Sequence, residues 1–257
     1  MVPHTSISQL KCFIQCPRKY YFQYVVRAEP AFRPLALVVG IAWHETIGVY
    51  LAGVGHGPLA SIEELKQHLR DGLTRGIEGG GIPVLFDEDL GAADVIDLGM
   101  KMLDVFVAKV VLPAEVLGVE VPFSMDLGHP ITGEILPIPV VGAIDALVVE
   151  DGSVTVLELK TAKRRWASDQ LEFDLQMSGY KMAARTLGHG EVELKLLVTT
   201  KTKVPDVQLE QLVRHRRDER EFAEVAFGVH RAINAGADHP LRGWQCRGCP
   251  YADACGA

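Results

Sequence analysis

Residues 141–160 decide the fold, and they read VGAIDALVVEDGSVTVLELK. Two runs rich in β-branched residues flank Asp151-Gly152, which is a favoured two-residue turn of a β-hairpin. Pairing the strands outward from this turn places Asp145 directly opposite Glu158. The segment therefore predicts two antiparallel strands that carry two acidic side chains face to face.

These two acids need an explanation, because like charges directly opposite one another destabilise a sheet. A divalent cation held by oxygen ligands would offset the repulsion. Lys160 lies two residues after Glu158, so it projects from the same face of the strand. The alternative is an edge hairpin with a solvated Glu–Lys pair. Against it, Asp145 interrupts an otherwise apolar strand, where an uncompensated charge is costly to bury.

Hydrophobic periodicity divides the rest of the chain into a mostly helical first half and a mixed second half. Ser6 and Gln9 form a capping box that opens a helix near Ile7, and Pro17 suits the first turn of the next helix. The predicted helices after Ile7 span 18–26, 40–51, 62–77, 89–111, 169–187 and 213–235. The predicted strands span 116–123, 138–149, 154–159 and 192–200. This order implies an α/β core rather than separate all-α and all-β domains.

Composition is that of a soluble globular protein of one or two domains, with 257 residues, 48% hydrophobic and 23% charged. Residues 1–6 lack the basic-then-apolar pattern of a signal peptide. Apolar stretches such as Leu35–Trp43 are too short to span a bilayer. We therefore expect a cytoplasmic protein with no membrane partner.

The net charge of −7 argues against a protein that coats nucleic acid, but a nuclease needs basic groups only along its groove. The basic clusters are Lys160-Lys163-Arg164-Arg165, Lys201-Lys203 and Arg214-His215-Arg216-Arg217. We expect each of them to be a solvated face. The first has the better claim to a function, because it adjoins the paired acids.

The cysteines indicate a metal centre, because clustered thiols in a cytosolic protein rarely form disulfides. Cys246, Cys249 and Cys255 lie in the tail, and either Cys12 or Cys16 is available to complete a four-cysteine site. Cys12 has the spacing of a buried apolar residue on the first helix. Zinc and an iron–sulfur cluster both suit four thiolates, although zinc ribbons usually supply two CxxC pairs and here one is missing.

The order of these motifs resembles the RecB-like branch of the PD-(D/E)xK nucleases. The run Gly142-x-Ile144-Asp145, followed by Glu158-Leu159-Lys160-Thr161, resembles the catalytic signature of that branch. Downstream, Gln176-x-x-x-Tyr180 resembles its additional Gln-xxx-Tyr motif, and upstream His44 resembles a helix histidine that joins the metal shell. A histidine beside Trp43 is also commonly an ordinary core or surface residue. His44 therefore has two interpretations, a metal ligand or a residue with no role beyond packing.

The cysteines resemble those of the iron–sulfur members of this branch, which include AddB-type and CRISPR-associated nucleases. Cys16, followed by Pro17, resembles their lone N-terminal ligand, and Cys246, Cys249 and Cys255 resemble their C-terminal run. The resemblance therefore implies a [4Fe–4S] cluster on these four residues, with a structural role, and Cys12 as a buried residue.

The fold implied by the resemblance is a restriction-endonuclease-like α/β core, in which helices flank a mixed central sheet. It divides the chain into a helical region (1–112), a nuclease core (113–238) and a cysteine knuckle (239–257) that joins the C-terminal to the N-terminal region. The helices between 51 and 111 match no motif, and we expect them to form a lobe over the active site through which a strand threads.

The activity implied is metal-dependent DNA hydrolysis, most simply by an exonuclease acting on single-stranded or frayed ends in CRISPR adaptation, repair or recombination. Asp145, Glu158, His44 and the Leu159 carbonyl would hold Mg²⁺ or Mn²⁺. Lys160 would orient the attacking water or stabilise charge on the phosphate. Gln176 and Tyr180 share a helix face and would brace the site or contact DNA.

Two other classes of function fit parts of the sequence. A non-catalytic DNA-binding adaptor would keep the fold and the cluster, yet both acids and the lysine are present. An iron–sulfur or zinc protein of unrelated function would leave Gln176 and Tyr180 unexplained. The chain has no P-loop sequence, so a helicase or CRISPR integration partner would be a separate protein.

Overall fold

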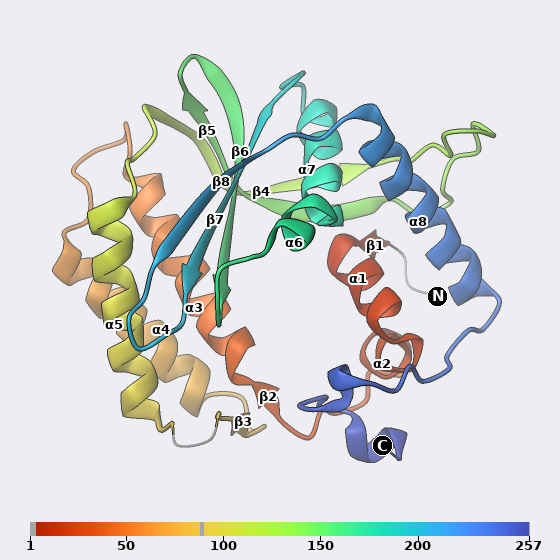
Figure 1. Cartoon of the computed structure of the whole chain (residues 1–257), viewed down its shortest axis with the longest axis horizontal. Coiled ribbons are helices and arrows are strands. Elements are labelled where there is room, and N and C mark those ends of the chain that lie inside the picture. The colour runs from red at the N-terminus through yellow and green to blue at the C-terminus, as the bar shows by residue number, and fades with distance from the viewer. Residues whose placement is uncertain (1–3, 88–89, 257) are drawn as a thin grey trace.

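A mixed β-sheet with helices on both faces forms the centre of the protein (Figure 1). The computed structural model describes residues 4–87 and 90–256. The strands of this sheet are β1 (Thr5–Ser6), β4 (Glu115–Met125), β5 (Val140–Glu150), β6 (Ser153–Ala162), β7 (Glu193–Thr200) and β8 (Val207–Leu212). Two short strands, β2 (Arg33–Pro34) and β3 (Val84–Leu85), pair with each other apart from it.

The helices form two layers, one on each face of the sheet. The first layer holds α1 (Ile7–Gln15), α7 (Leu175–Thr186) and α8 (Arg216–Asn234), with the short α6 (Ser168–Glu172) before α7. The second layer holds α3 (Leu35–Ala52), α4 (Ile62–Glu78) and α5 (Ala92–Lys109). Short elements near the two ends are α2 (Pro17–Tyr20), the π-helical turn η1 (Tyr21–Val25), the 3-10 turn η2 (Trp244–Cys246) and α9 (Ala252–Cys255).

Strand pairing makes the sheet mixed, as expected from the sequence. The strand order is β4-β5-β6-β7-β8, and β1 pairs with the start of β5. The β6–β7 and β1–β5 pairs are parallel, while the remaining pairs are antiparallel. The predicted α/β class, with helices flanking a mixed sheet, is confirmed.

The predicted hairpin is also confirmed. Asp151 (φ 49°) and Gly152 (φ 78°) both have left-handed backbones, as a tight two-residue hairpin turn requires. The register runs from the turn to the pair Ala146↔Leu157 and stops there. Beyond Leu157, β6 stays paired with β7 on its other edge, while β5 and β6 separate from each other at the next residue of each strand, a point we call the fork.

The fork disturbs the alternation of side chains along β5. Ile144 and Leu147 belong to the core on the α1–α7–α8 face, whereas Ala146 and Val148 belong to the core on the α3–α4–α5 face. Strict alternation would put Ile144 and Ala146 on the same face. The change of face therefore occurs at Asp145, where the sheet is open between the two helical layers.

Several predicted helix boundaries are wrong, and local capping explains two of them. The helix predicted over 169–187 is broken at Phe173, because the Asp174 side chain accepts hydrogen bonds from the N–H groups of Gln176 and Met177 and starts α7. The helix predicted over 213–235 begins at Arg216, because the Asp218 carboxylate accepts the N–H of His215 and completes the start of α8.

Other differences concern helix starts and one missed strand. Helix α3 begins five residues before its predicted start at residue 40. The helix predicted over 89–111 is α5, and residue 89 itself lies outside the described residues. The helix predicted over 18–26 continues from α2 into the π-helical η1. Strand β8 was not predicted, although its residues alternate between apolar and polar.

Helix α3 is longer than the apolar stretch expected at 35–43, and by length and composition it could cross a membrane. It is the one described helix with these properties, and its mean hydropathy is 1.6. Trp43, Ile47 and Leu51 on this helix are nevertheless buried in the core beside the sheet. Packing within the protein therefore explains part of the apolar character of α3.

Candidate functional site

The two acids of the hairpin meet at the fork, although not as a direct cross-strand pair. One Asp145 oxygen (Oδ2) accepts a hydrogen bond of 2.8 Å from the Leu159 backbone N–H. Asp145 and Glu158 are 7% and 1% exposed. The sequence predicted that Asp145 and Glu158 form a direct cross-strand pair. In the structure the pairing of β5 with β6 ends at Ala146↔Leu157, one position before that pair. The Asp145 side chain spans the gap and bonds to Leu159.

Glu158 is the least satisfied charged group among the described residues of the site. Its Oε1 atom is bonded to the ammonium of Lys160, but its Oε2 atom is buried and has no hydrogen-bond partner. Burial, together with the charge of Asp145, raises the pKa of Glu158 to about 8, although Lys160 opposes this shift. A buried carboxylate oxygen without a partner is costly, and this oxygen is suited to bind a cation.

Lys160 belongs to a chain of polar contacts that runs from the sheet to α7. Its ammonium contacts Glu158 and donates to the Gln176 side-chain oxygen at 3.0 Å. The Gln176 amide in turn donates to the Tyr180 hydroxyl at 2.8 Å. Burial raises the pKa of Tyr180, so its hydroxyl is neutral at physiological pH. The structure thus brings together four of the predicted site residues through α7 and β6.

Tyr180 is held in the core rather than presented to solvent. It is 6% exposed, and its ring packs edge-on against Phe123 with 5.9 Å between ring centroids. Asp174, which caps α7, is bound by Lys11 at 2.8 Å, so α1 also helps to fix this end of the helix. These contacts favour a bracing role over a DNA contact for the Gln176–Tyr180 pair.

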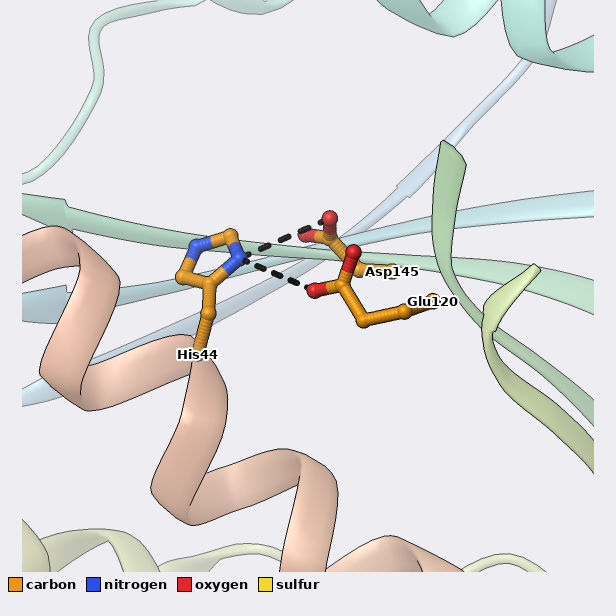
Figure 2. A group of neighbouring side chains, drawn as sticks. All are labelled: His44, Glu120 and Asp145. Atoms are coloured by element: carbon orange, nitrogen blue, oxygen red, sulfur yellow. Dashed lines mark ion pairs between the residues drawn. The ribbon is translucent and has the colours of Figure 1, made fainter. Parts of the chain in front are cut away.

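His44 approaches Asp145 and Glu120 from the opposite helical layer (Figure 2). Its Nδ1 atom lies 3.5 Å from an Asp145 oxygen and 4.0 Å from a Glu120 oxygen. Burial lowers the pKa of His44, but the hydrogen bond and charge of Asp145 outweigh burial, and the net pKa is raised. For Asp145 the effects are opposite in sign. Burial raises the pKa of this carboxyl, but the contacts with His44 and the Leu159 amide outweigh burial, and the net pKa is lowered.

Glu120 is a member of this group that the sequence analysis missed. The β4–β5 register pairs Val119 with Ala146 and Val121 with Ile144, so Glu120 lies opposite Asp145. Glu120 also has a left-handed backbone (φ 48°), which is uncommon for a residue with a side chain. Its ligand atom lies within 4.8 Å of those of His44 and Asp145, a spacing that could hold a metal ion.

The three acids therefore span three adjacent strands, with Asp145 between Glu120 and Glu158. The sequence gives only a weak signal for Glu120. It shows an acidic residue in a strand, but it does not show which residue of another strand lies opposite that acid. Its register depends on how β4 pairs with β5 across the long connection 126–139. Leu159 lies beside the acids through its N–H, and ligation by its carbonyl stays a prediction.

The donor set fits a hard divalent cation. Carboxylate oxygens with one imidazole suit Mg²⁺ or Mn²⁺, whereas a soft metal would favour thiolates. The unpartnered Glu158 oxygen gives a structural reason for a cation here, since one would neutralise the adjacent carboxylates.

The cysteines lie at a second place, between α2 and the C-terminal tail. Figure 1 shows these two segments near each other. Cys16, Cys246, Cys249 and Cys255 all line one small cavity between α2 and the tail. The Ala31 N–H donates to the Pro250 carbonyl at 2.9 Å, and Phe22 stacks on Tyr251. Cys12 does not line this cavity; it is 8% exposed, and burial raises its pKa to about 11. The predicted burial of Cys12 is confirmed.

The basic clusters are less uniform than expected. Arg214 is buried rather than solvated, and its guanidinium donates to the backbone carbonyls of Leu171 and Asp174. Lys163 pairs with Asp87 at 2.8 Å, and Arg165 pairs with Asp206 at the same distance. The prediction of a solvated face is therefore wrong for Arg214, which supports the turn before α7.

The chain was compared with curated proteins and with solved structures. No curated protein shows a significant sequence match. A solved structure from Eubacterium rectale, described as a candidate exonuclease, has a TM-score of 0.56 at 15% identity, over 99% of this chain and 87% of that chain. A second structure, SSO0001, has a TM-score of 0.40 at 13% identity, over 96% of this chain and 94% of that chain.

The family comparison covers nearly the whole chain. The model of the PD-(D/E)XK nuclease superfamily matches residues 4–256, which include the fork, α7 and the cysteine tail. The likeness to the Eubacterium rectale structure, at its low identity, concerns the fold alone. The protein belongs to the PD-(D/E)XK nuclease superfamily.

Proposed function

We propose that this nuclease is a metal-dependent DNA exonuclease of the RecB-like branch, acting on single-stranded or frayed ends. The observation that carries the proposal is the fork, where Asp145, Glu158 and Lys160 converge and one buried Glu158 oxygen has no partner. A purely structural pair of acids would have no reason to keep that oxygen unsatisfied.

Asp145, Glu158, His44 and Glu120 would hold Mg²⁺ or Mn²⁺. A bound divalent ion would polarise the scissile phosphate and lower the pKa of a water. The Leu159 N–H keeps the Asp145 carboxylate turned into the fork.

Lys160 has the contacts expected of a residue that would stabilise negative charge on the phosphate. Its ammonium lies between Glu158 and Gln176, and Gln176 is itself held by Tyr180. This chain would fix the ammonium toward the scissile phosphate, where it would stabilise negative charge or orient the attacking water. Gln176 and Tyr180 would act as positioning residues.

The four tail and N-terminal cysteines would hold a [4Fe–4S] cluster. The observation that supports this part of the proposal is that Cys16, Cys246, Cys249 and Cys255 all line one small cavity. Four thiolates suit either an iron–sulfur cluster or zinc. A cluster there would tie α2 to the tail and restrict the unfolded chain.

Cleavage of end-labelled linear DNA by the cluster-containing protein, purified without oxygen, tests the proposal. We expect metal-dependent digestion of single-stranded DNA, with the labelled end reporting polarity, and much slower digestion of circular single strands. Equal digestion of circles would contradict exonuclease action. Failure to cut single-stranded, duplex or flapped DNA would favour the alternative, a non-catalytic adaptor of a helicase or CRISPR integration complex.

A further inference from the structure

We infer that the cavity between α3 and α4, one helical turn before His44, binds an unpaired nucleotide of the substrate strand. This inference rests on the proposed function and names the feature that would select single-stranded DNA.

Helix α3 covers the sheet with its second half and extends beyond the strands with its first half. His44 faces Asp145, and a Cβ at Gly48 would lie 3.1 Å from Val119 of β4. Positions 37, 41, 44 and 48 share one face of a helix. Figure 1 shows the first turns of α3 running past the strands towards β2.

This overhanging face carries apolar side chains that solvent reaches. Leu37 is 54% exposed and Ile41 is 52% exposed. Both lie on the same helix face as His44, at seven and three residues before it, which corresponds to about 10 Å and 5 Å along the helix axis. An apolar stripe therefore leads from solvent to the metal-binding group.

A cavity of about 240 Å³ lies beside this stripe. Its lining combines apolar and charged side chains: Arg33, Leu37, Val38, Ile41, Glu45, Gly72, Arg75 and Gly76. The glycines bring α4 close to α3, since a Cβ at Gly76 would lie 2.6 Å from Val38 and one at Gly72 would lie 3.2 Å from Ala42. The recess follows from this close approach.

Two guanidinium groups give the cavity a positive edge in a chain of net charge −7. Arg33 is fixed by the backbone carbonyls of Ile77, Gly79 and Ile82 at the end of α4. Arg75 pairs with Glu45 at 3.4 Å, and both side chains are exposed. An exposed pair of this kind is weak, so a phosphate can replace Glu45 as the partner of Arg75.

A nucleotide of a single strand matches this arrangement. Its base would lie against Leu37 and Ile41, and its phosphate would face Arg75. Bases of a duplex are paired and stacked inside it, so they cannot reach an apolar wall, whereas bases of a single strand can. The cavity would thus favour single strands and hold the strand one turn from the cleavage site.

Binding measurements in chelator, without divalent ions, separate this inference from catalysis. The double variant Leu37→Ser/Ile41→Ser should bind a fluorescent oligothymidine about tenfold more weakly, because hydroxyl groups would replace the apolar wall against which the base lies. Blunt duplex should bind as it does to the unmodified protein. Val49→Ser is the matched control, because Val49 is a 44% exposed apolar residue of α3 that does not line the cavity.

A second variant tests the phosphate contact. Arg75→Ala should lower the slope of log affinity against log salt for the single strand by about 0.7, the value for one phosphate contact. Unchanged binding by the double variant, equal loss for single strand and duplex, or equal loss in Val49→Ser would overturn the inference. If the double variant binds and digests DNA as the unmodified protein does, the nucleotide site in the cavity is refuted and the nuclease activity stands. If the double variant binds more weakly but the unmodified protein cuts no DNA, the nuclease activity is refuted and the nucleotide site stands.

Discussion

The Asp145 carboxylate accepts a hydrogen bond of 2.8 Å from the Leu159 N–H, across the point where β5 and β6 separate. This bond replaces the backbone pairing that the hairpin would otherwise continue. On either side of this point, His44 of α3 contacts Asp145, and Lys160, which is held by Gln176 of α7, contacts Glu158. The fork is therefore the structural basis of the site.

Removal of the Lys160 ammonium should abolish most cleavage. We expect Lys160→Ala to lower the rate on single-stranded DNA by about 100- to 1,000-fold, the usual cost of removing one group that stabilises transition-state charge. Lys163→Ala is the control, since Lys163 is exposed and pairs with Asp87. Single-turnover digestion measures both, and equal rates for Lys160→Ala and the unmodified protein would rule out the assigned role.

Glu158 should make the metal-free protein less stable as pH rises. Its folded pKa is about 8 and its ordinary value is 4.5, so the unfolded state releases the proton first. The contribution of Glu158 is fully present below about pH 4.5 and is lost as pH rises to about 8. Urea unfolding between pH 5 and 8 should show this decline.

Glu158→Gln, which cannot ionise, should show a smaller decline over the same pH range. Manganese should restore stability at pH 8 in the unmodified protein but much less in this variant, because binding to the folded state stabilises it. Parallel pH profiles for the two proteins would show that Glu158 is not the group responsible.

Loss of the Glu120 charge should weaken metal binding without loss of the fold. We expect Glu120→Gln to lower the Mn²⁺ affinity about tenfold, the lower end of the effect seen for residues supporting a metal site. The free energy of unfolding without metal should stay the same or rise, since a negative charge opposite Asp145 is removed.

Calorimetric titration with Mn²⁺ measures this effect, and it does not depend on cleavage. Glu115→Gln is the matched control, because Glu115 is an exposed acid of the same strand that lies opposite Val149. Equal affinities for Glu120→Gln and Glu115→Gln would show that Glu120 makes no contribution to the metal site.

The two N-terminal cysteines should behave differently. Cys16→Ser should remove the broad visible absorption of an iron–sulfur cluster and lower the thermal stability, because the tail loses its link to α2. Cys12→Ala should keep the absorption, since Cys12 does not line the cavity. If the unmodified protein and the Cys12→Ala variant contain zinc and no iron, the proposal of an iron–sulfur cluster is refuted.

The sequence by itself determined the features that depend on neighbouring residues. Asp151-Gly152 specifies the turn, and that turn specifies the register as far as Ala146↔Leu157. Ser6 and Gln9 form the expected capping box at α1. Side-chain period and local hydrogen bonds act over a few residues, so they are visible in one sequence and they predicted the α/β class.

Tertiary structure decided what joins distant segments. The fork depends on β7 holding β6 in the sheet where β5 separates from it, and Glu120 needs the β4–β5 register across residues 126–139. Arg214 is buried because the turn before α7 packs on it. His44 meets Asp145, and Gln176 meets Lys160, only because a helical layer covers each face of the sheet. Such contacts depend on packing between segments far apart in the chain, which no local pattern specifies.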